Sequence, residues 1–359
     1  MSDNSIGEKL KVTVFGQSHA PGIGAVIEGY PSGRQIDWDQ VSAFMARRAP
    51  GQNAWSTTRK EADAPQILSG LNEKGETCGA PICALIENQN TRSKDYSSLL
   101  HTPRPGHADY AAYLKYGESW DVRGGGQFSG RLTAPICFAG ALCMQLLKEK
   151  GIEISAHIAR IGSIQDDRPD CLDPAMPLYP ADRFPVINPE KGEDMKAEIE
   201  AARQKGDSVG GAIRCVVTGV PGGLGGPMFG GLEGRLSLGL FGIPAVKAVE
   251  FGDGLAAASG HGSEFNDSFC AEDGKIGTRT NHQGGIQGGI SNGMPLHFTV
   301  YFKPTPSIAC AQRSVYLPTG EEKELIIQGR HDPCVVPRAV PVVEAMAAMI
   351  LTDMILQGA

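Results

Sequence analysis

The sequence lacks the features that mark several large classes of protein. Its nine cysteines include no CxxC pair and no grouping with histidine at zinc-ligand spacing, so we expect reduced thiols and no metal site. The N-terminus has no apolar core after a basic start, and no apolar run approaches the ~18 residues that a membrane helix needs. The net charge of -7 is opposite to the basic excess of a nucleic-acid-binding protein. These absences predict a cytoplasmic protein that acts on neither membranes nor nucleic acids.

Glycine, by contrast, is abundant. The chain holds 47 glycines in 359 residues, about 13% where ~7% is usual. Hydrophobic residues make up 41% and charged residues 20%, which is the balance of a folded protein. Because many of the glycines are grouped, we expect numerous tight backbone loops, and we expect these loops to hold the ligand.

Short strands and helices alternate along the chain and indicate a single α+β domain over residues 1–359. Strands are expected at residues 11–16, 81–86, 212–219 and 296–303. Helices are expected at residues 37–48, 133–150, 193–205 and 340–356. Asp37 and Thr133 are expected to cap the first two helices, and Pro341 to lie near the start of the last. Long glycine-rich connections argue against repeated βαβ units.

Arginines gather in segments that glycine and proline punctuate. They are Arg47, Arg48, Arg59, Arg104, Arg123, Arg131, Arg330 and Arg338. A guanidinium pairs bidentately with phosphate or carboxylate, so an acidic protein that places arginines on rigid loops is suited to bind an anion. Salt bridges at the surface or between subunits would explain the same arginines, and composition alone leaves the two interpretations about equally open.

Three histidines lie among or beside these loops, and one of them, His331, stands between Arg330 and Asp332. His19 follows a predicted strand in FGQSHAPG, and His107 stands between Arg104 and Asp109 in RPGHAD. Histidine is the side chain best suited to proton transfer near neutral pH, and both contexts favour a functional role. The remaining histidines that we interpret as structural are His101, His157, His261, His282 and His297.

Two further glycine clusters, residues 219–231 and 281–293, could cradle a phosphate or a flavin ring with backbone amides. The first lacks the Lys-Ser/Thr of a P-loop, and neither has the spacing of a dinucleotide-binding turn. Plain tight turns would explain both clusters equally well, so they identify no cofactor.

Taken in order, these segments resemble the chorismate synthases. The motifs that carry the resemblance are RPGHADY (104–110), GGG (124–126), NH-GGI-GGI (281–290), KPT-SI (303–308) and GRHDPC with RAVP (329–341). The resemblance runs from Ile6 to the C-terminal helix, and the combination of GRHDPC, RAVP and RPGHADY is specific to that family.

The resemblance implies a fold and a reaction. The fold would be a β-α-β sandwich, with two antiparallel sheets enclosing helices, assembled as a homotetramer. The enzyme would be a lyase that eliminates phosphate in an anti-1,4 sense from 5-enolpyruvylshikimate 3-phosphate to give chorismate, at the end of the shikimate pathway. It would require reduced FMN without net redox change, and NADPH would be a possible source of the reducing equivalents.

Roles also transfer residue by residue from the resemblance. His19 would be the general acid at the leaving phosphate, His107 would contact the flavin and govern its protonation, and Asp332 would take up the substrate proton near flavin N5. Substrate-binding residues are expected at Ser18, Arg48, Arg104, Ser129, Arg131 and Arg330. FMN-binding residues are expected at Gln127, Phe128, Ser129, Pro244, Ala245, Gly288, Lys303, Pro304, Thr305, Pro306, Ser307 and Arg330.

The chain departs from the family pattern within these same segments. GQSHA (16–20) replaces the usual GESHG, GQFSGRL (126–132) replaces GRSSARE, and Ala54 replaces an arginine. Two other hypotheses therefore stay open beside an active synthase. One is a catalytically impaired paralogue that binds FMN or a pathway intermediate, and the other is a flavin reductase that uses NAD(P)H.

Overall fold

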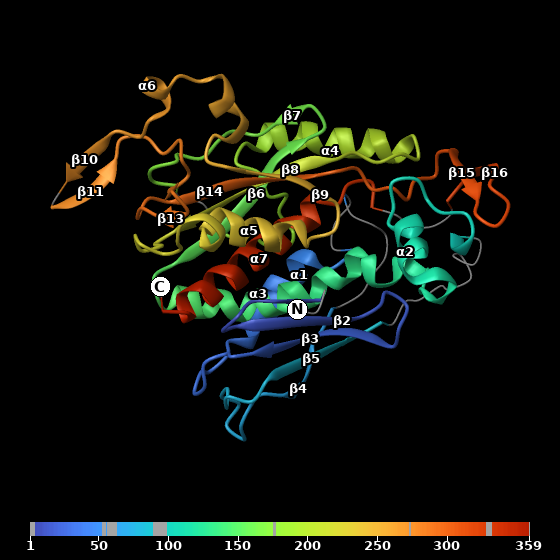
Figure 1. Cartoon of the computed structure of the whole chain (residues 1–359), viewed down its shortest axis with the longest axis horizontal. Coiled ribbons are helices and arrows are strands. Elements are labelled where there is room, and N and C mark those ends of the chain that lie inside the picture. Colours follow the sequence, from blue (N-terminus) through green and yellow to red (C-terminus); the bar gives the residue numbers. More distant parts are fainter. Residues whose placement is uncertain are drawn as a thin grey trace.

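The protein is described by a computed structural model that covers residues 4–51, 55, 63–88, 99–174, 177–272, 274–327 and 332–358. Two five-stranded sheets enclose a layer of helices (Figure 1). Every strand pair in both sheets is antiparallel. The expected α+β sandwich of two antiparallel sheets around helices is therefore confirmed.

The first sheet comes from the N-terminal part of the chain. Its strand order is β1 (Ser5–Ile6), β2 (Lys11–Gly16), β3 (Gly22–Glu28), β5 (Ile82–Glu87) and β4 (Gln66–Ser69). Ile23, Ala25 and Ile27 alternate along β3 and are completely buried, as the two-residue period of a strand with one core-facing side requires.

The second sheet lies on the opposite side of the helices. Its strand order is β7 (Ile164–Gln165), β6 (Glu153–Ile161), β8 (Gly211–Thr218), β14 (Leu296–Phe302) and β9 (Val246–Phe251). Strand β14 pairs with β8 on one side and β9 on the other, so the apolar segment predicted at residues 296–303 is an interior strand.

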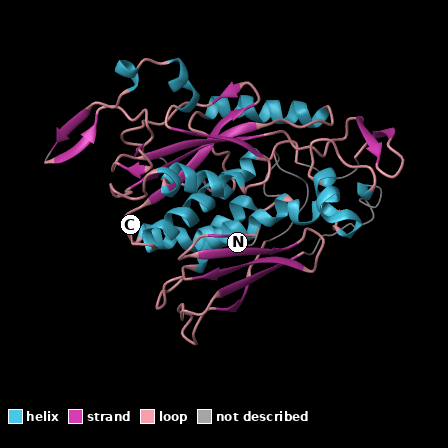
Figure 2. Ribbon diagram, in the orientation of Figure 1, coloured by secondary structure: helices cyan, strands magenta, loops and turns pink. Residues whose placement is uncertain are grey.

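The layer between the sheets contains α1 (Trp38–Arg48), α3 (Thr133–Lys148), α5 (Leu232–Phe241) and α7 (Val336–Leu356), while α4 (Pro189–Gln204) packs outside the second sheet (Figures 1 and 2). The shorter helices are α2 (Asp109–Tyr116) and α6 (Gly262–Phe265), with 3-10 turns η2 (Gly117–Ser119), η3 (Arg123–Phe128), η4 (Gly130–Leu132), η5 (Met228–Gly230) and η6 (Gly254–Ser259).

Three small hairpins complete the described elements. They are β10 (Phe269–Glu272) with β11 (Lys275–Thr278), β12 (Ile286–Gln287) with β13 (Ile290–Ser291), and β15 (Gln312–Tyr316) with β16 (Glu321–Leu325). The β10–β11 and β15–β16 hairpins project from opposite ends of the sandwich (Figure 1).

The starts of three helices differ from the predictions. Helix α4 begins at Pro189 because the Asn188 side chain accepts hydrogen bonds from the backbone N–H groups of Glu190 and Lys191. Thr133 is the first residue of α3 rather than its cap, and its hydroxyl donates to the Gly130 carbonyl at 2.6 Å. Helix α7 begins at Val336, so Pro341 lies inside it and the helix continues past the proline.

Helix α7 forms the centre of the core. By length and composition, α7 and the segment Arg123–Lys148 could each span a membrane, so the expectation that no such apolar run exists was wrong for them. The most apolar windows of these segments are 89% and 78% buried inside the fold. We conclude that both are apolar because sheets and helices surround them.

Two buried carboxylates fix α7 to its surroundings. Glu344 accepts hydrogen bonds from Arg47 Nη1 at 2.5 Å and from the Ala156 backbone N–H at 2.8 Å. Asp353 accepts from the backbone N–H groups of Lys9 at 2.7 Å and Leu10 at 2.9 Å. Glu344 is therefore held by α1 and β6, and Asp353 ties the C-terminal helix to the N-terminal segment.

Candidate active site

A cavity of about 540 Å³ opens at one end of the helical layer. Six segments meet there: the C-terminal end of α1, the loop before α2, the turns before α3, the loop after α5, the loop after β14, and the start of α7. Most of the residues that line it lie in loops and turns. Core elements border several of these segments, because the loop after α5 leads into β9 and the loop after β14 leaves the second sheet.

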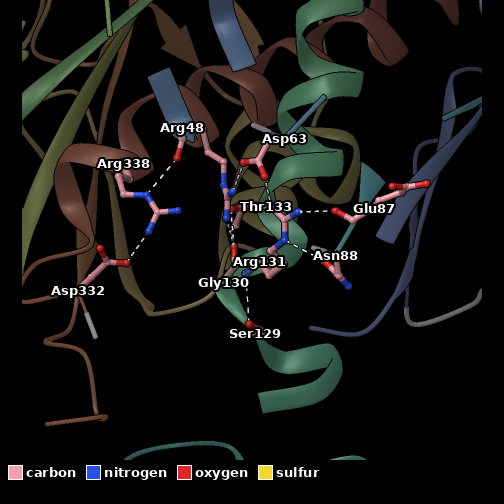
Figure 3. Close-up of polar contacts among 10 residues, drawn as sticks. All are labelled: Arg48, Asp63, Glu87, Asn88, Ser129, Gly130, Arg131, Thr133, Asp332 and Arg338. Carbon is pink, nitrogen blue, oxygen red and sulfur yellow. Dashed lines mark hydrogen bonds and ion pairs between the residues drawn. The ribbon is translucent and has the colours of Figure 1, made fainter. Parts of the chain in front are cut away.

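Two arginines meet a single buried carboxylate at one side of the cavity (Figure 3). Asp63, which is 3% exposed, accepts from Nη1 of both Arg48 and Arg131. Burial alone would raise the pKa of Asp63, but the two guanidinium groups outweigh it and lower that pKa. Asp63 therefore stays ionised and neutralises part of the charge of both arginines.

The remaining donors of this arginine pair also have protein partners. Arg48 donates to Thr133 Oγ1 and to the Gly130 carbonyl, both at 3.0 Å. Arg131 donates from Nε to Asn88 Oδ1 at 3.0 Å. Helix α1, the turn before α3 and the end of β5 thus hold the two guanidinium groups in fixed orientations along the wall.

Asp332 lies on the opposite side of the cavity, at the entry to α7. Its carboxylate accepts from Arg338 Nη1 at 2.6 Å, and Arg338 Nε donates to the Arg48 carbonyl at 3.0 Å (Figure 3). Burial lowers the pKa of Arg338, and the carboxylate of Asp332 opposes that shift. Arg338 therefore connects the proposed proton acceptor Asp332 to the arginine pair.

His107 belongs to a second polar group, in the loop that leads into α2. Its Nδ1 lies 2.5 Å from Asp109 Oδ1, and Asp109 also accepts from Arg104 Nε at 2.7 Å. Arg104 Nη1 donates to Ser307 Oγ at 3.0 Å, which links this loop to the one after β14. Burial lowers the pKa of His107, and the nearby Arg104 and Lys303 add to this effect while Asp109 opposes it.

The triple-glycine turn packs against both candidate histidines. Gly124, Gly125 and Gly126 have positive φ angles of 61°, 83° and 54°. A Cβ on Gly124 would lie 2.2 Å from His19 Nδ1, and a Cβ on Gly125 would lie 3.2 Å from His107 Nε2. Glycine is therefore needed here both for the backbone conformation and for the close approach. Ser18 contacts the same turn, since its backbone N–H donates to the Gly126 carbonyl at 3.1 Å.

The structure brings most of the sequence-predicted residues to this cavity. The predicted residues that line it are Arg48, Arg104, His107, Gln127, Phe128, Ser129, Arg131, Pro244, Ala245, Lys303, Thr305, Pro306, Ser307 and Asp332. Ser18 and His19 lie against Gly124, which is part of the wall. Pro304 lies between two lining residues, whereas Gly288 lies away from the wall in the β12–β13 turn. Ala54, Arg59 and Arg330 are outside the described residues.

Two segments expected to bind FMN are joined directly. The Lys303 backbone N–H donates to the Ala245 carbonyl at 3.0 Å, and Ala245 has a positive φ of 73°. Phe128 also lines the cavity and packs edge to face on Trp120, with ring centroids 6.4 Å apart. The cavity lining therefore includes apolar groups as well as arginines.

Sequence reasoning missed the carboxylates that organise these groups. Asp63 was not singled out because nothing in its local sequence indicates that it meets Arg48 and Arg131. Asp109 was noted only as a neighbour of His107, although their separation of two residues was a usable signal. Arg338 was counted among the arginines without a role, and its contact with Asp332 depends on the first turn of α7.

The cavity is lined by cationic side chains, a histidine and a carboxylate that is paired with an arginine, and it lies in a two-sheet α+β sandwich. This combination defines an enzyme that acts on a small anionic substrate. Comparison with known proteins agrees with that class. The family model described as chorismate synthase matches residues 10–356. The chain belongs to the chorismate synthase family.

Individual relatives match over nearly the whole chain. Chorismate synthase of Lancefieldella parvula is 44% identical over 366 aligned residues, which cover 98% of this chain and 96% of that protein. Chorismate synthase of Methanocella arvoryzae is 45% identical over 358 residues, with 100% and 95% covered. A crystal structure of chorismate synthase is similar with a TM-score of 0.75 at 28% identity, and the match covers 98% of this chain and 93% of that one.

Proposed function

We propose that this protein is a chorismate synthase, a lyase that eliminates phosphate from 5-enolpyruvylshikimate 3-phosphate with reduced FMN as its cofactor. The observation that carries the proposal is the grouping of Arg104, His107, Lys303 and Asp332 around one cavity in a chain of that family. The proposed substrate has a phosphate and two carboxylates, and clustered cations on rigid loops are the groups that bind such anions.

The lining fits a flavin as well as an anion. Its volume of about 540 Å³ lies within the ~300–1,000 Å³ that small-molecule sites usually have. Phe128, Ile243, Pro244 and Ala245 offer an apolar surface for a flat ring system, while Lys303 offers a cation for a phosphate. Reduced FMN, when bound, would supply transient electron density to the substrate with no net redox change.

The chain's own residues would have three tasks in the elimination. Arg104 and its neighbouring cations would hold the substrate anions and stabilise the negative charge that develops on the leaving phosphate. His19 would give a proton to that phosphate as general acid. Asp332 would accept the substrate proton, and its ion pair with Arg338, at 2.6 Å, would hold the carboxylate in place.

His107 would hold a proton next to the cofactor. Because burial, Arg104 and Lys303 together lower the pKa of His107, the imidazole would be largely neutral at neutral pH. A neutral imidazole can accept a proton on one nitrogen while it donates from the other. This property suits a residue that governs the protonation of a bound cofactor.

Anaerobic turnover tests the proposal. The protein, dithionite-reduced FMN and 5-enolpyruvylshikimate 3-phosphate are mixed, and chorismate is followed by its absorbance. Turnover should occur, and it should fall by about 10² or more in both His19→Ala and His107→Ala. His261→Ala is the matched control, because the His261 side chain is 84% exposed beside Glu264, and it should keep full activity.

Three results would contradict the proposal or part of it. Absence of chorismate while FMN still binds would favour an impaired paralogue. Gln127 and Phe128, which differ from the family pattern, would then be the first residues to change back to that pattern. Nicotinamide oxidation without an external reductant would indicate that the protein reduces its own flavin with NADPH. A normal rate in both histidine variants would refute their assigned roles.

The assembly and location of the enzyme are part of the same proposal. We expect a single-domain subunit in a cytoplasmic homotetramer. The exposed apolar side chains of Met228, Phe229, Leu238 and Phe241 on η5 and α5 support self-association. Sedimentation equilibrium would test the tetramer, and a monomer at micromolar concentration would contradict it.

A further inference from the structure

Asp109 is placed to control which nitrogen of His107 carries the proton. It is the first residue of α2 and is 1% exposed. Its Oδ1 lies 2.5 Å from His107 Nδ1 and accepts from Arg104 Nη2 at 2.8 Å. Its Oδ2 accepts from Arg104 Nε at 2.7 Å and from the Arg104 backbone N–H at 3.0 Å. The carboxylate therefore bridges the guanidinium and the imidazole.

The charge state of Asp109 follows from these contacts. Burial would raise the pKa of Asp109, but the hydrogen bonds from Arg104 and His107 outweigh it and lower that pKa far below the ordinary value. An ionised carboxylate only accepts hydrogen bonds. The hydrogen between Asp109 Oδ1 and His107 must therefore belong to Nδ1 of the imidazole.

One contact of Arg104 competes with this assignment. Arg104 Nη2 lies 3.1 Å from His107 Nδ1 and could donate to that nitrogen only if it were unprotonated. The contact with the ionised Asp109 carboxylate is shorter, at 2.5 Å, and Arg104 Nη2 has Asp109 Oδ1 as its acceptor at 2.8 Å. The guanidinium thus binds Asp109 and leaves Nδ1 to the carboxylate. In the neutral ring the remaining lone pair is on Nε2, the atom that lies toward Gly125 beside the cavity wall.

We propose that Asp109 is a positioning residue that holds His107 with Nδ1 protonated and makes Nε2 the nitrogen that exchanges a proton with the bound ligand. A carboxylate in this place also stabilises the imidazolium when Nε2 gains a proton. The ion-pair partner Arg104 keeps Asp109 ionised and fixes its orientation. This inference rests on the proposed function only for the identity of the proton-exchange partner.

Nitrogen-15 NMR of histidine-labelled protein tests the inference without any turnover. The His107 signals are assigned from their loss in His107→Gln. The wild-type protein near neutral pH should show neutral His107 with a protonated Nδ1 and an unprotonated Nε2. In Asp109→Asn the Nε2-protonated form should appear, because the amide can donate to Nδ1. A wild-type spectrum with Nε2 protonated and Nδ1 free overturns the proposal.

Kinetics supply a second readout. In Asp109→Asn we expect kcat to fall by about 10²-fold, the lower end of what a positioned proton-transfer group contributes, with a smaller change in KM. The substitution removes the carboxylate that raises the pKa of His107 and leaves Arg104 and Lys303, both of which lower that pKa. The midpoint of the pH profile that is due to His107 should therefore move to lower pH. An unchanged pH profile with wild-type kcat overturns the proposal.

A matched control separates positioning from stability. Asp166 is also a buried aspartate, 8% exposed, and accepts from the backbone N–H groups of Ile187 and Asn188 outside the cavity. Asp166→Asn should lower the melting temperature and leave the His107 signals and the pH profile unchanged. If Asp109→Asn does not fold, the wild-type spectrum still decides. If the protein makes no chorismate, the NMR result stands while the proposed function fails.

Discussion

The close packing of the triple-glycine turn against His19 leads to a sharp prediction. Gly124 has a φ of 61°, and a Cβ added there would lie 2.2 Å from His19 Nδ1 and 2.5 Å from Ser18 Oγ. Gly124→Ala should therefore impose two separate costs. One is the strain of a left-handed backbone in a residue with a Cβ, and the other is displacement of the two side chains that occupy the space.

The two costs have different magnitudes and different effects. A left-handed conformation costs an alanine about 1–2 kcal/mol, and forcing an extra carbon into a packed site costs a further ~1–3 kcal/mol. We expect Gly124→Ala to lose about 2–5 kcal/mol of unfolding free energy. A misplacement of His19 by roughly 1 Å should also reduce kcat by about 10²-fold.

Gly151→Ala is the control that isolates the contact with His19. Gly151 follows α3 with a φ of 73°, and a Cβ there would meet nothing within 4 Å. It should lose only the backbone part, about 1–2 kcal/mol, and keep its activity. Urea unfolding and anaerobic turnover measure the two effects. Equal stability and equal kcat in the two variants would refute the packing of the turn against His19.

Two other substitutions test the walls of the cavity. Asp63→Asn leaves Arg48 and Arg131 buried without their carboxylate and should lose about 3–5 kcal/mol in urea unfolding at pH 7. The pKa of Asp63 is lowered in the folded state, so its stabilisation is present above the ordinary value of ~3.9 and is lost as the pH falls through the folded value. Wild type should thus lose stability more steeply than Asp63→Asn below about pH 4, and parallel curves would contradict this. Phe128→Ala removes the edge-to-face contact with Trp120. The free energy of unfolding should fall by about 0.5–1.5 kcal/mol beyond the loss of apolar burial. A melting temperature equal to that of the wild type would show that the contact contributes nothing.

Local sequence patterns predicted part of each sheet. The strands expected at residues 11–16, 81–86, 212–219 and 296–303 correspond to β2, β5, β8 and β14, whereas β3 was not predicted although its apolar residues alternate. The continuous apolar run of β14 follows from burial of both faces of that strand. The start of α4 was placed four residues late because the cap at Asn188 precedes the charged run that drew attention to the helix. Pro341 was expected near the start of α7, but tertiary burial continues that helix one turn beyond the proline toward the N-terminus.

The cations, the histidines and Asp332 of the candidate site were predicted, whereas the carboxylates of Asp63 and Asp109 were given no role. Motifs of glycine, arginine and histidine are visible along the chain, so Arg104 and His107 could be found from the residues themselves, whereas Lys303 was implied by the family resemblance. The partners that set their charge and orientation come from elsewhere in the fold. Asp63 reaches Arg131 across 68 positions of sequence, and only the assembled layers bring such residues into contact.

The burial of α7 has a consequence for the order in which the protein can be made. Helix α7 (residues 336–356) contacts α1, α3, α5, β6 and β8, and it leaves the ribosome after all of these elements. Until that helix arrives, the apolar faces that it covers are exposed, and Lys9 and Leu10 have no Asp353 to receive their N–H groups. The core therefore cannot close before α7 has been synthesised, and until then the nascent protein carries exposed apolar surface that chaperones would need to cover.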